Sequence, residues 1–272
     1  MAKLRLDKLL VERELCSSRQ LAQRLIQAGE VRVKGEIVDK VGTEVPIDAL
    51  IEVKQRPRFV SRGGEKLIKA LAEFQISVID RVCLDGGIST GGFTDCLFQS
   101  GAKLVYGIDV GYGQVDWKIR TDDRLVLKER VNLRNLTADQ LYTADSLRPD
   151  LGVVDVSFIS LGKVLPALAN LLAGNKELVL LVKPQFEVGR EAIGKNGVVR
   201  DAVAQAGAIE GVLNAAILLG WFAQGLTFSP LVGPAGNIEF LLWLSLVNKA
   251  VVIDRLIIDQ VVNAAQTSLN TR

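Results

Sequence analysis

Four charged side chains lie in or beside apolar segments of the chain, where charge is uncommon: Lys66, Asp155, Lys183 and Glu239. Two amines and two carboxylates can move protons and orient a reacting hydroxyl. The 272-residue chain has no histidine, which excludes a serine–histidine–aspartate triad, a cysteine–histidine nucleophile and a histidine-bound metal. Taken singly, each of the four also fits an ordinary strand end, and Glu239 also fits a position facing water. Together they favour a reaction site built from lysines and carboxylates.

A glycine-rich segment carries the motif Asp-Gly-Gly-Ile-Ser-Thr-Gly-Gly-Phe at residues 85–93. Glycines let a backbone turn tightly and approach a ligand, and the following helix N-terminus attracts negative charge. The spacing differs from a dinucleotide-binding G-x-G-x-x-G loop, and the lysine of a P-loop is absent. Asp85 would repel a pyrophosphate but suits the ammonium of S-adenosylmethionine, and Asp109 suits ribose hydroxyls. A structural turn without a ligand is the alternative.

The candidate cofactor-binding residues are therefore those of the loop and one strand end. They are Asp85, Gly86, Gly87, Ser89, Thr90, Gly91, Gly92, Phe93 and Asp109.

From Lys66 onward the apolar pattern predicts alternating strands and helices. Strands are predicted over residues 81–84, 104–109, 125–131, 151–156, 177–182, 225–231 and 237–246, and helices over 65–74, 202–219 and 251–265. The last two strands lie close together in the sequence and are predicted to pair antiparallel. The alternation predicts an α/β fold, with a mostly parallel sheet covered on both faces. Such sheets bind ligands at the carboxyl ends of their strands, where Asp155 and Lys183 are placed.

The first 60 residues are predicted to form a separate α+β module, residues 1–60, ahead of a larger domain, residues 61–272. Helices are predicted over 6–13 and 19–28, a hairpin over 31–38 turning at Lys34 and Gly35, a strand over 51–53 and a linker over 54–64. Ser17 or Ser18 can cap the second helix and Gly29 can end it. Residues 1–60 hold 12 Lys and Arg against 9 Asp and Glu, a net charge of +3. Residues 61–272 hold the other 21 Lys and Arg and 22 Asp and Glu, a net charge of −1. The excess favours a polyanionic partner, with a solvated surface as the alternative.

This module resembles the S4-type RNA-binding domain over residues 3–54. The resemblance rests on Arg-Leu-Asp-Lys-Leu-Leu at 5–10, Ser-Arg at 18–19, the segment 29–38 and Ile-Glu-Val at 51–53. It implies that basic side chains contact RNA phosphates, and the candidates are Arg5, Lys8, Arg19, Arg24, Lys34 and, in the linker, Arg62. Guanidinium groups fit phosphate oxygens and fix position rather than sequence. Any single one of them also fits a solvated side chain.

The whole chain resembles the TlyA family, whose members are traditionally called hemolysins. The motifs are those at 61–67, 85–95, 109–114, 155–160, 182–187 and 236–239. The resemblance implies a Rossmann-like methyltransferase that uses S-adenosylmethionine and a tetrad of Lys66, Asp155, Lys183 and Glu239. It also implies 2′-O-methylation of cytidine ribose in ribosomal RNA, on one or both subunits. Two departures are the Gly87-Ile88 pair, where Ala often follows the first loop glycine, and residues 58–60, where some relatives carry Trp.

A ribose 2′-hydroxyl is a poor nucleophile, so methyl transfer needs a base and close alignment with the sulfonium methyl. Lys183 is the expected base. A second ammonium, Lys66, is expected to favour the neutral amine of Lys183, and Asp155 and Glu239 are expected to orient the pair. No metal is required.

Three alternatives come from other classes: a membrane-lytic protein, a non-catalytic ribosome-assembly protein and a pseudouridine synthase that shares the first module. No apolar stretch approaches the roughly 20 residues that a bilayer requires, and the N-terminus lacks the apolar core of a signal peptide. Cys16, Cys83 and Cys96 are far apart, which suits a reducing compartment. We therefore expect a cytoplasmic protein whose partners are ribosomal RNA or ribosomal subunits.

Overall fold

The computed structural model describes residues 2–54, 57–247 and 251–269. The chain divides into two compact units, residues 1–57 and 58–272. The boundary lies three residues before the predicted one. Residues 59 and 60 belong to the larger unit because the Phe59 ring packs against Gly64, leaving no room there for a Cβ, and the Val60 amide donates to Asp95 Oδ2 at 2.9 Å.

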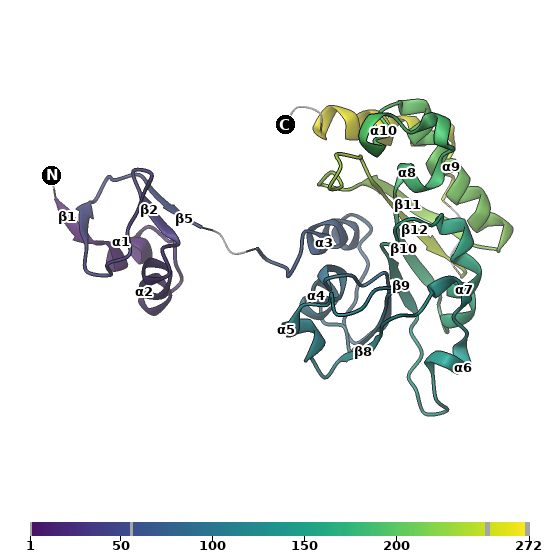
Figure 1. The fold of residues 1–272 in the computed structure, drawn as a ribbon, viewed down its shortest axis with the longest axis horizontal. Helices are drawn as coiled ribbons and strands as arrows, with labels where there is room; N and C mark the ends of the chain where they lie inside the picture. Colours follow the sequence, from purple (N-terminus) through teal and green to yellow (C-terminus); the bar gives the residue numbers. More distant parts are fainter. Residues whose placement is uncertain (1, 55–56, 248–250, 270–272) are drawn as a thin grey trace. The chain divides into compact units, whose positions relative to one another are not determined.

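Over its described residues, 2–54 and 57, the smaller unit contains two helices and two small sheets (Figure 1). Its elements are β1 (Lys3–Arg5), α1 (Leu6–Glu12), α2 (Arg19–Gln27), β2 (Val31–Val33), β3 (Glu36–Ile37), β4 (Glu44–Pro46) and β5 (Ile51–Val53). The predicted helices, hairpin and last strand are confirmed. β1 and β4, which pair antiparallel with each other, were not predicted, because three-residue strands joined only by a long-range contact leave no local pattern.

Local signals in this unit act as the sequence indicated. The Ser18 hydroxyl accepts a hydrogen bond from the Leu21 amide, and Gly29 follows α2 in the left-handed conformation. Apolar side chains from both helices and from β2 form one core with Leu10, Ile26 and Val31 at its centre. The unit therefore has the packing of an independent small domain.

The larger unit is built on a seven-stranded sheet with the strand order β11-β12-β10-β9-β6-β7-β8. The strands are β6 (Val82–Gly86), β7 (Leu104–Ile108), β8 (Leu125–Lys128), β9 (Leu151–Val154), β10 (Glu177–Val182), β11 (Phe222–Phe228) and β12 (Phe240–Ser245). The strands from β8 to β10 are parallel, and β12 runs antiparallel to both β10 and β11. The order turns back at β6, between β7 and β9, which is where α/β sheets bind ligands.

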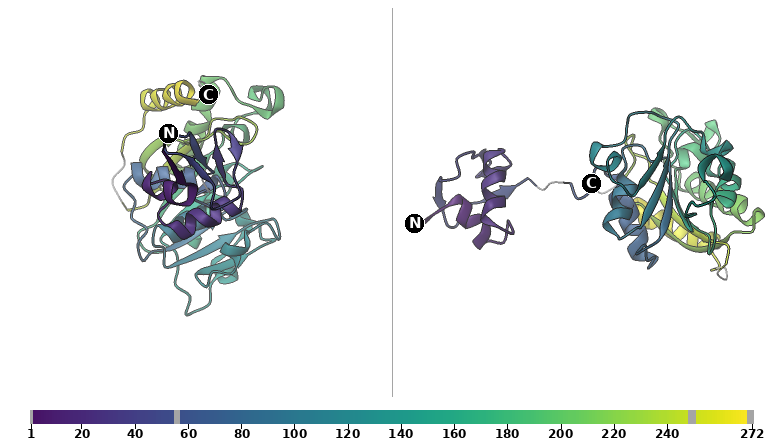
Figure 2. Two further views of the ribbon diagram at one scale, coloured as in Figure 1. Left: turned by 90° about the vertical axis from the view of Figure 1, so that its left-hand side faces the viewer. Right: turned by 90° about the horizontal axis from the view of Figure 1, so that it is seen from below.

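Helices cover both faces of this sheet (Figures 1 and 2). One layer holds α3 (Gly63–Glu73), α4 (Gly92–Gln99) and α5 (Trp117–Arg120), and the other holds α7 (Leu165–Leu171), α9 (Ala202–Leu218) and α10 (Arg255–Leu269). The short helices α6 (Ala138–Leu141) and α8 (Pro184–Glu187) complete the unit. On β10, Leu180 faces one core and Leu181 the other, so the strand is buried on both sides. The predicted α/β fold is confirmed.

Predicted boundaries near the C-terminus were wrong for β11, β12 and α10. β11 ends at Phe228 rather than at residue 231, β12 begins at Phe240 rather than at residue 237, and α10 ends at Leu269 rather than at residue 265. β11 begins at Phe222, three residues early, because it pairs with β12 from that point and a bulge between Ala223 and Gly225 keeps the glycine within the strand. α10 begins at Arg255 rather than at residue 251. The Val251 amide donates to the Ala223 carbonyl beside β11, and the Asp254 carboxylate accepts from the Ile257 amide, as a helix-capping residue does.

Candidate active site

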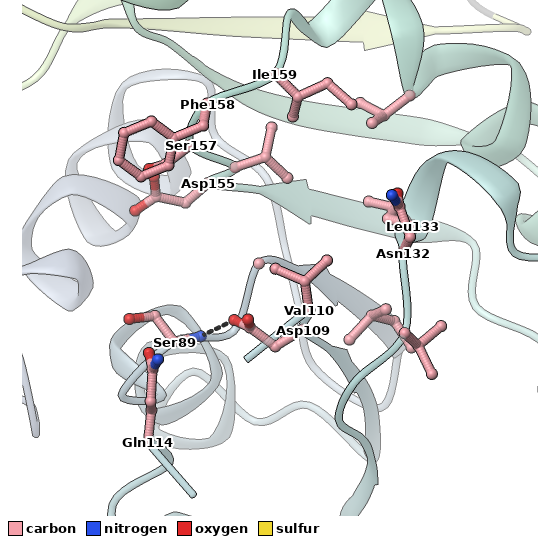
Figure 3. Close-up of a pocket in the computed structure, with 15 residues that line it drawn as sticks. Ser89, Asp109, Val110, Gln114, Asn132, Leu133, Asp155, Ser157, Phe158 and Ile159 are labelled. Carbon is pink, nitrogen blue, oxygen red and sulfur yellow. Dashed lines mark hydrogen bonds between the residues drawn. The ribbon is translucent and has the colours of Figure 1, made fainter. Parts of the chain in front are cut away.

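A cavity of about 310 Å³ opens at the carboxyl ends of the parallel strands (Figure 3). Gly87 and Ser89 follow β6, Asp109 follows β7, Asn132 lies beyond β8, and Asp155 follows β9. The remaining lining residues are Ile108, Val110, Gln114, Val131, Leu133, Val156, Ser157, Phe158, Ile159 and Val164. The cavity is therefore mostly apolar with a few polar groups, as small-molecule sites are.

A second cavity of about 190 Å³ shares Gly87, Ser89 and Asp155 with the first. Its other walls come from α3 and the segment before it, from the glycine loop (residues 85–93) and from Pro234. The residues of α3 and of the two segments are Ser61, Arg62, Gly63, Lys66, Ile88, Thr90, Gly92 and Phe93. Two adjoining cavities with a shared carboxylate can hold two reactants side by side. Asp155 and Lys66 face the second of them.

The glycine loop separates the two cavities and needs its glycines. Gly87 has a φ of +88°, and a Cβ there would lie 2.6 Å from the Asp155 carbonyl oxygen. Gly91 precedes α4 with a φ of +95°, and a Cβ on Gly92 would collide with Ser61. A side chain at Gly87 or Gly92 would therefore push the loop away from Asp155 or from the segment before α3.

Asp85 lies behind this loop and lines neither cavity. Its side chain is fully buried, its Oδ2 accepts the Thr94 hydroxyl at 2.7 Å, and its Oδ1 has no partner among the described residues. Burial raises the pKa of Asp85 to about 7, against the hydrogen bond from Thr94, and the nearby charges of Asp155 and Asp109 add to the rise. An unpartnered buried carboxylate oxygen is a place where a cationic group would be stabilised.

Asp109 stands at the end of β7 and faces the first cavity. Its Oδ2 accepts the Ser89 amide at 2.7 Å, the bond drawn in Figure 3, and its Oδ1 accepts the Gly111 amide at 2.7 Å. The carboxylate thus holds the glycine loop against the loop after β7. Fixed in this way, it can accept further hydrogen bonds from a ligand in the cavity.

The four charged residues form two ion pairs. Lys66 Nζ lies 2.6 Å from Glu239 Oε2, and Lys183 Nζ lies 2.6 Å from Asp155 Oδ1. Burial raises the pKa of Glu239, and Lys66 opposes that rise; Asp155 raises it further and Lys183 lowers it. Because Glu239 responds to all three of the others, the four residues share one electrostatic environment.

This geometry changes one expectation from the sequence, the placement of Glu239. Glu239 does not lie inside a strand or face water: it precedes β12, is 1 % exposed and meets Gly233, where a Cβ would lie 2.7 Å from Glu239 Oε1. Each lysine pairs with one of the two carboxylates that were expected to orient the pair.

A contact between residues 183–187 and the loop after β9 was not predicted from the sequence. Lys183 reaches the start of this loop, donating to the Ser157 hydroxyl at 2.8 Å. Glu187 reaches its end, accepting the Ser160 hydroxyl at 2.7 Å and the Leu161 amide at 2.8 Å. The two acceptors, Ser157 and Glu187, lie in the motifs at 155–160 and 182–187 that carry the family resemblance. The occurrence of both motifs in one chain was the signal in the sequence that could have indicated this contact.

Phe158 sits in the middle of the same loop and was also missed. Its φ is +64° and its side chain is 91 % exposed, at the rim of the first cavity. The ring centroid lies 5.1 Å from that of Phe186. A left-handed phenylalanine costs backbone energy, and an exposed ring gains nothing from burial, so the position points to a contact with a ligand.

The candidate RNA-binding residues fall in both units. Within the smaller unit, Arg5 and Arg19 converge on Asp7. Lys8, Arg24 and Lys34 are exposed, and Lys34 has a φ of +52° at the hairpin turn. Arg62 is exposed in the larger unit, where it precedes α3 and lines the second cavity.

Among residues 2–54, 57–247 and 251–269, no helix has the length and apolar character needed to cross a membrane. Within the same ranges, no group of three or more cysteine, aspartate or glutamate side chains is placed to hold a metal ion.

Two family models match the chain. The FtsJ-like methyltransferase model covers residues 59–246, and the S4 domain model covers residues 4–51. The protein is thus an FtsJ-like methyltransferase of Rossmann-like fold with an S4 domain before it.

Similar curated and solved proteins agree with these models. The 16S/23S rRNA (cytidine-2′-O)-methyltransferase TlyA of Mycobacterium tuberculosis is 48 % identical, over 88 % of this chain and 89 % of that protein. Hemolysin A of Brachyspira hyodysenteriae is 40 % identical, over 88 % of this chain and 98 % of that protein. The solved structure "Putative hemolysin from Streptococcus thermophilus" is 42 % identical and superimposes with a TM-score of 0.75, covering 100 % of this chain and 98 % of that one. The chain belongs to the TlyA family, which confirms the resemblance seen in the sequence.

Proposed function

We propose that this protein transfers a methyl group from S-adenosylmethionine to the ribose 2′-hydroxyl of a cytidine in ribosomal RNA. The observation that carries the proposal is the convergence of the Lys183–Asp155 and Lys66–Glu239 pairs on two adjoining cavities at the switch point of the sheet. The 48 % identity to a protein named for this reaction supports the choice of substrate.

The residues around the first cavity fit the proposed cofactor. Asp109 can accept hydrogen bonds from ribose hydroxyls, and the apolar walls Ile108, Val110 and Leu133 can enclose a flat base. The loop at Gly87 gives a ligand close access to the backbone, and the free Oδ1 of Asp85 lies behind it to stabilise an ammonium. When bound, S-adenosylmethionine supplies the methyl group on a sulfonium sulfur.

Lys183 is proposed to take the proton from the 2′-hydroxyl. Asp155 Oδ1 and Ser157 Oγ hold its Nζ in a fixed position for this step. Asp155 also lines both cavities, so it orients Lys183 where the two reactants would meet. Lys66 is proposed to hold the target ribose, because Glu239 fixes its Nζ beside the second cavity.

Phe158 is proposed to stack on the base of the target nucleotide. Proteins that recognise single-stranded RNA stack its splayed-out bases on aromatic side chains. The ring stands at the rim of the first cavity, three residues after Asp155. The S4 unit is proposed to hold the surrounding RNA by its phosphates, with ribosomal subunits in the cytoplasm as the partners.

Transfer of tritiated methyl groups tests the proposal. Purified small and large ribosomal subunits that lack the modification are incubated with the protein and labelled S-adenosylmethionine, and the RNA is then digested to nucleosides. We expect label in 2′-O-methylcytidine with wild-type protein and none with Lys183→Ala. Label in a base, or no label on either subunit with wild-type protein, would contradict the assignment.

The same preparation separates the alternatives from other classes. A binding-only protein would retain ribosomal subunits without transferring label. A pseudouridine synthase would change uridine without using the cofactor. A membrane-lytic protein, as the name of the Brachyspira relative suggests for that protein, would release dye from liposomes.

A further inference from the structure

Asp7 is a buried carboxylate in the first turn of α1 that joins two separate elements of the S4 unit. Its side chain is 0 % exposed. Arg5, at the end of β1, donates from Nε at 3.1 Å and Nη2 at 3.3 Å; Arg19, the first residue of α2, donates from Nε at 2.7 Å; and Gln23 donates from Nε2 at 3.0 Å. Every oxygen of the carboxylate is therefore occupied by side chains of this unit.

The two arginines face outward from this buried anchor. Their side chains are 42 % and 50 % exposed, although the carboxylate that holds them is inaccessible. Arg19 uses only Nε on Asp7, and within the described part of the chain no bond engages its two Nη groups. Arg5 likewise keeps Nη1 free there. Each guanidinium thus presents donors to solvent with its plane already fixed.

The energetics of Asp7 favour a role in geometry rather than in stability. Burial would raise the pKa of Asp7, but the hydrogen bonds from Arg5, Gln23 and Arg19 outweigh burial and hold that pKa far below its usual range. The carboxylate is therefore ionised at any working pH. Buried ion pairs add little net stability compared with apolar packing, whereas they fix the relative placement of the groups they join.

We propose that Asp7 is a positioning residue for RNA recognition: it sets Arg5 and Arg19 as one preformed cationic surface for the phosphodiester backbone. Two arginines around one carboxylate leave a local charge of about +1 and several donors in fixed directions, the arrangement that suits a phosphate. The proposal rests on the proposed function only for the nature of the ligand, an RNA.

The direction in which Asp7→Asn changes the affinity for RNA distinguishes positioning from a simple effect of charge. Asp7→Asn removes a negative charge from a unit that meets a polyanion, so charge alone predicts tighter RNA binding. Positioning predicts the opposite, because a neutral amide holds the two guanidinium groups weakly. Glu12→Gln is the matched control, since Glu12 is an exposed acid on the same helix.

The measurement is filter binding of end-labelled, transcribed ribosomal RNA to the full chain at several salt concentrations. For Asp7→Asn we expect the affinity for RNA to fall about tenfold, the scale of a lost charge-assisted contact. The slope of log affinity against log salt concentration should become shallower by about one, because about one counterion fewer is released. Glu12→Gln should bind as tightly as wild type or more tightly. Unchanged or tighter binding by Asp7→Asn would overturn the proposal.

A double-mutant cycle with Arg19→Gln excludes a merely structural effect. If Asp7 acts through Arg19, Asp7→Asn should add little to the loss already caused by Arg19→Gln. Full additivity, or no loss from Arg19→Gln itself, would also overturn the proposal. In methyl transfer, the KM for ribosomal subunits should rise while kcat and cofactor affinity stay unchanged. Failure of wild-type protein to transfer methyl groups would contradict the proposed function, and the binding measurements would still judge Asp7.

Discussion

Lys183 Nζ and Asp155 Oδ1 lie 2.6 Å apart, although the two residues follow different strands of the sheet. Asp155 follows β9 and Lys183 follows β10, and these strands are parallel neighbours. Strand pairing therefore brings the two side chains together at one edge of the sheet. The fold itself builds the pair.

Lys183→Ala should reduce methyl transfer by about 10²–10⁴-fold, the usual contribution of a general base. Cofactor affinity should stay nearly unchanged, because Lys183 does not line the first cavity and the loss falls on the transition state. Lys183→Arg should not restore activity, since a guanidinium stays protonated. Single-turnover methyl transfer against pH measures both variants. A robustly active Lys183→Arg protein would make residue 183 a fixed charge and move the base to Asp155 or to the RNA.

Asp109→Ala should weaken binding of S-adenosylmethionine by about 1–3 kcal/mol, because a carboxylate that accepts ligand hydroxyls is lost. The variant also loses the bonds to the Ser89 and Gly111 amides, which hold two loops together. Asp109→Asn is the milder comparison, because its amide oxygen can keep one of these bonds. Titration calorimetry gives both affinities. Equal affinity of wild type and Asp109→Ala would remove Asp109 from the cofactor site.

The order of strands and the strand-end charges followed from sequence because both are local. An apolar run that ends in Asp155 or Lys183 marks where a buried strand emerges. The partner of Lys66 is 173 residues away, and the burial of Glu239 depends on space left by Gly233, so neither could be inferred from spacing. Asp7 draws donors from three places along the chain. The left-handed backbone at Phe158 runs against the preference of the residue, so the residue type could not predict it.

Asp85 should make the protein less stable as pH rises from about 4 to about 7. Burial raises the pKa of Asp85 from an ordinary 3.8 to about 7, so in this range the folded chain holds a proton that the unfolded chain has lost. Stability falls with pH wherever the folded state binds more protons. Asp85→Asn should remove this dependence. Its unfolding free energy should exceed that of wild type at pH 8, by at most on the order of 4 kcal/mol, and match it below about pH 4. Urea unfolding across this range measures the difference.

Binding of S-adenosylmethionine should strengthen as pH rises toward 7 and should release a proton below that pH. An ammonium near Asp85 Oδ1 favours the ionised carboxylate, so binding and deprotonation are linked. Calorimetry in buffers of different ionisation enthalpy counts the released protons. Asp85→Asn should release fewer protons than wild type. Identical proton release by the two proteins would place the ammonium elsewhere.

Glu187→Ala should lower kcat/KM for ribosomal subunits by about tenfold or more, because two hydrogen bonds to a carboxylate are lost at once. These bonds hold Ser160 and Leu161, at the end of the loop that carries Asp155 and Phe158. Burial raises the pKa of Glu187, and the hydrogen bonds from Leu161 and Ser160 oppose that rise. Burying this carboxylate costs solvation free energy, and the two hydrogen bonds that it accepts offset part of that cost.

Glu187→Gln separates geometry from charge at this position. Its amide oxygen can accept the Leu161 amide and its amide nitrogen can donate to the Ser160 hydroxyl, so both contacts survive without the charge. We expect Glu187→Gln to keep most of the activity, and Ser160→Ala, which loses one contact, to fall between Gln and Ala. The three variants are compared by methyl transfer at saturating cofactor, with thermal unfolding as the check on folding. If Glu187→Gln is as damaging as Glu187→Ala while both proteins stay folded, the negative charge itself is what the site requires, and Glu187 would belong to the electrostatics of Lys183 rather than to the support of the loop.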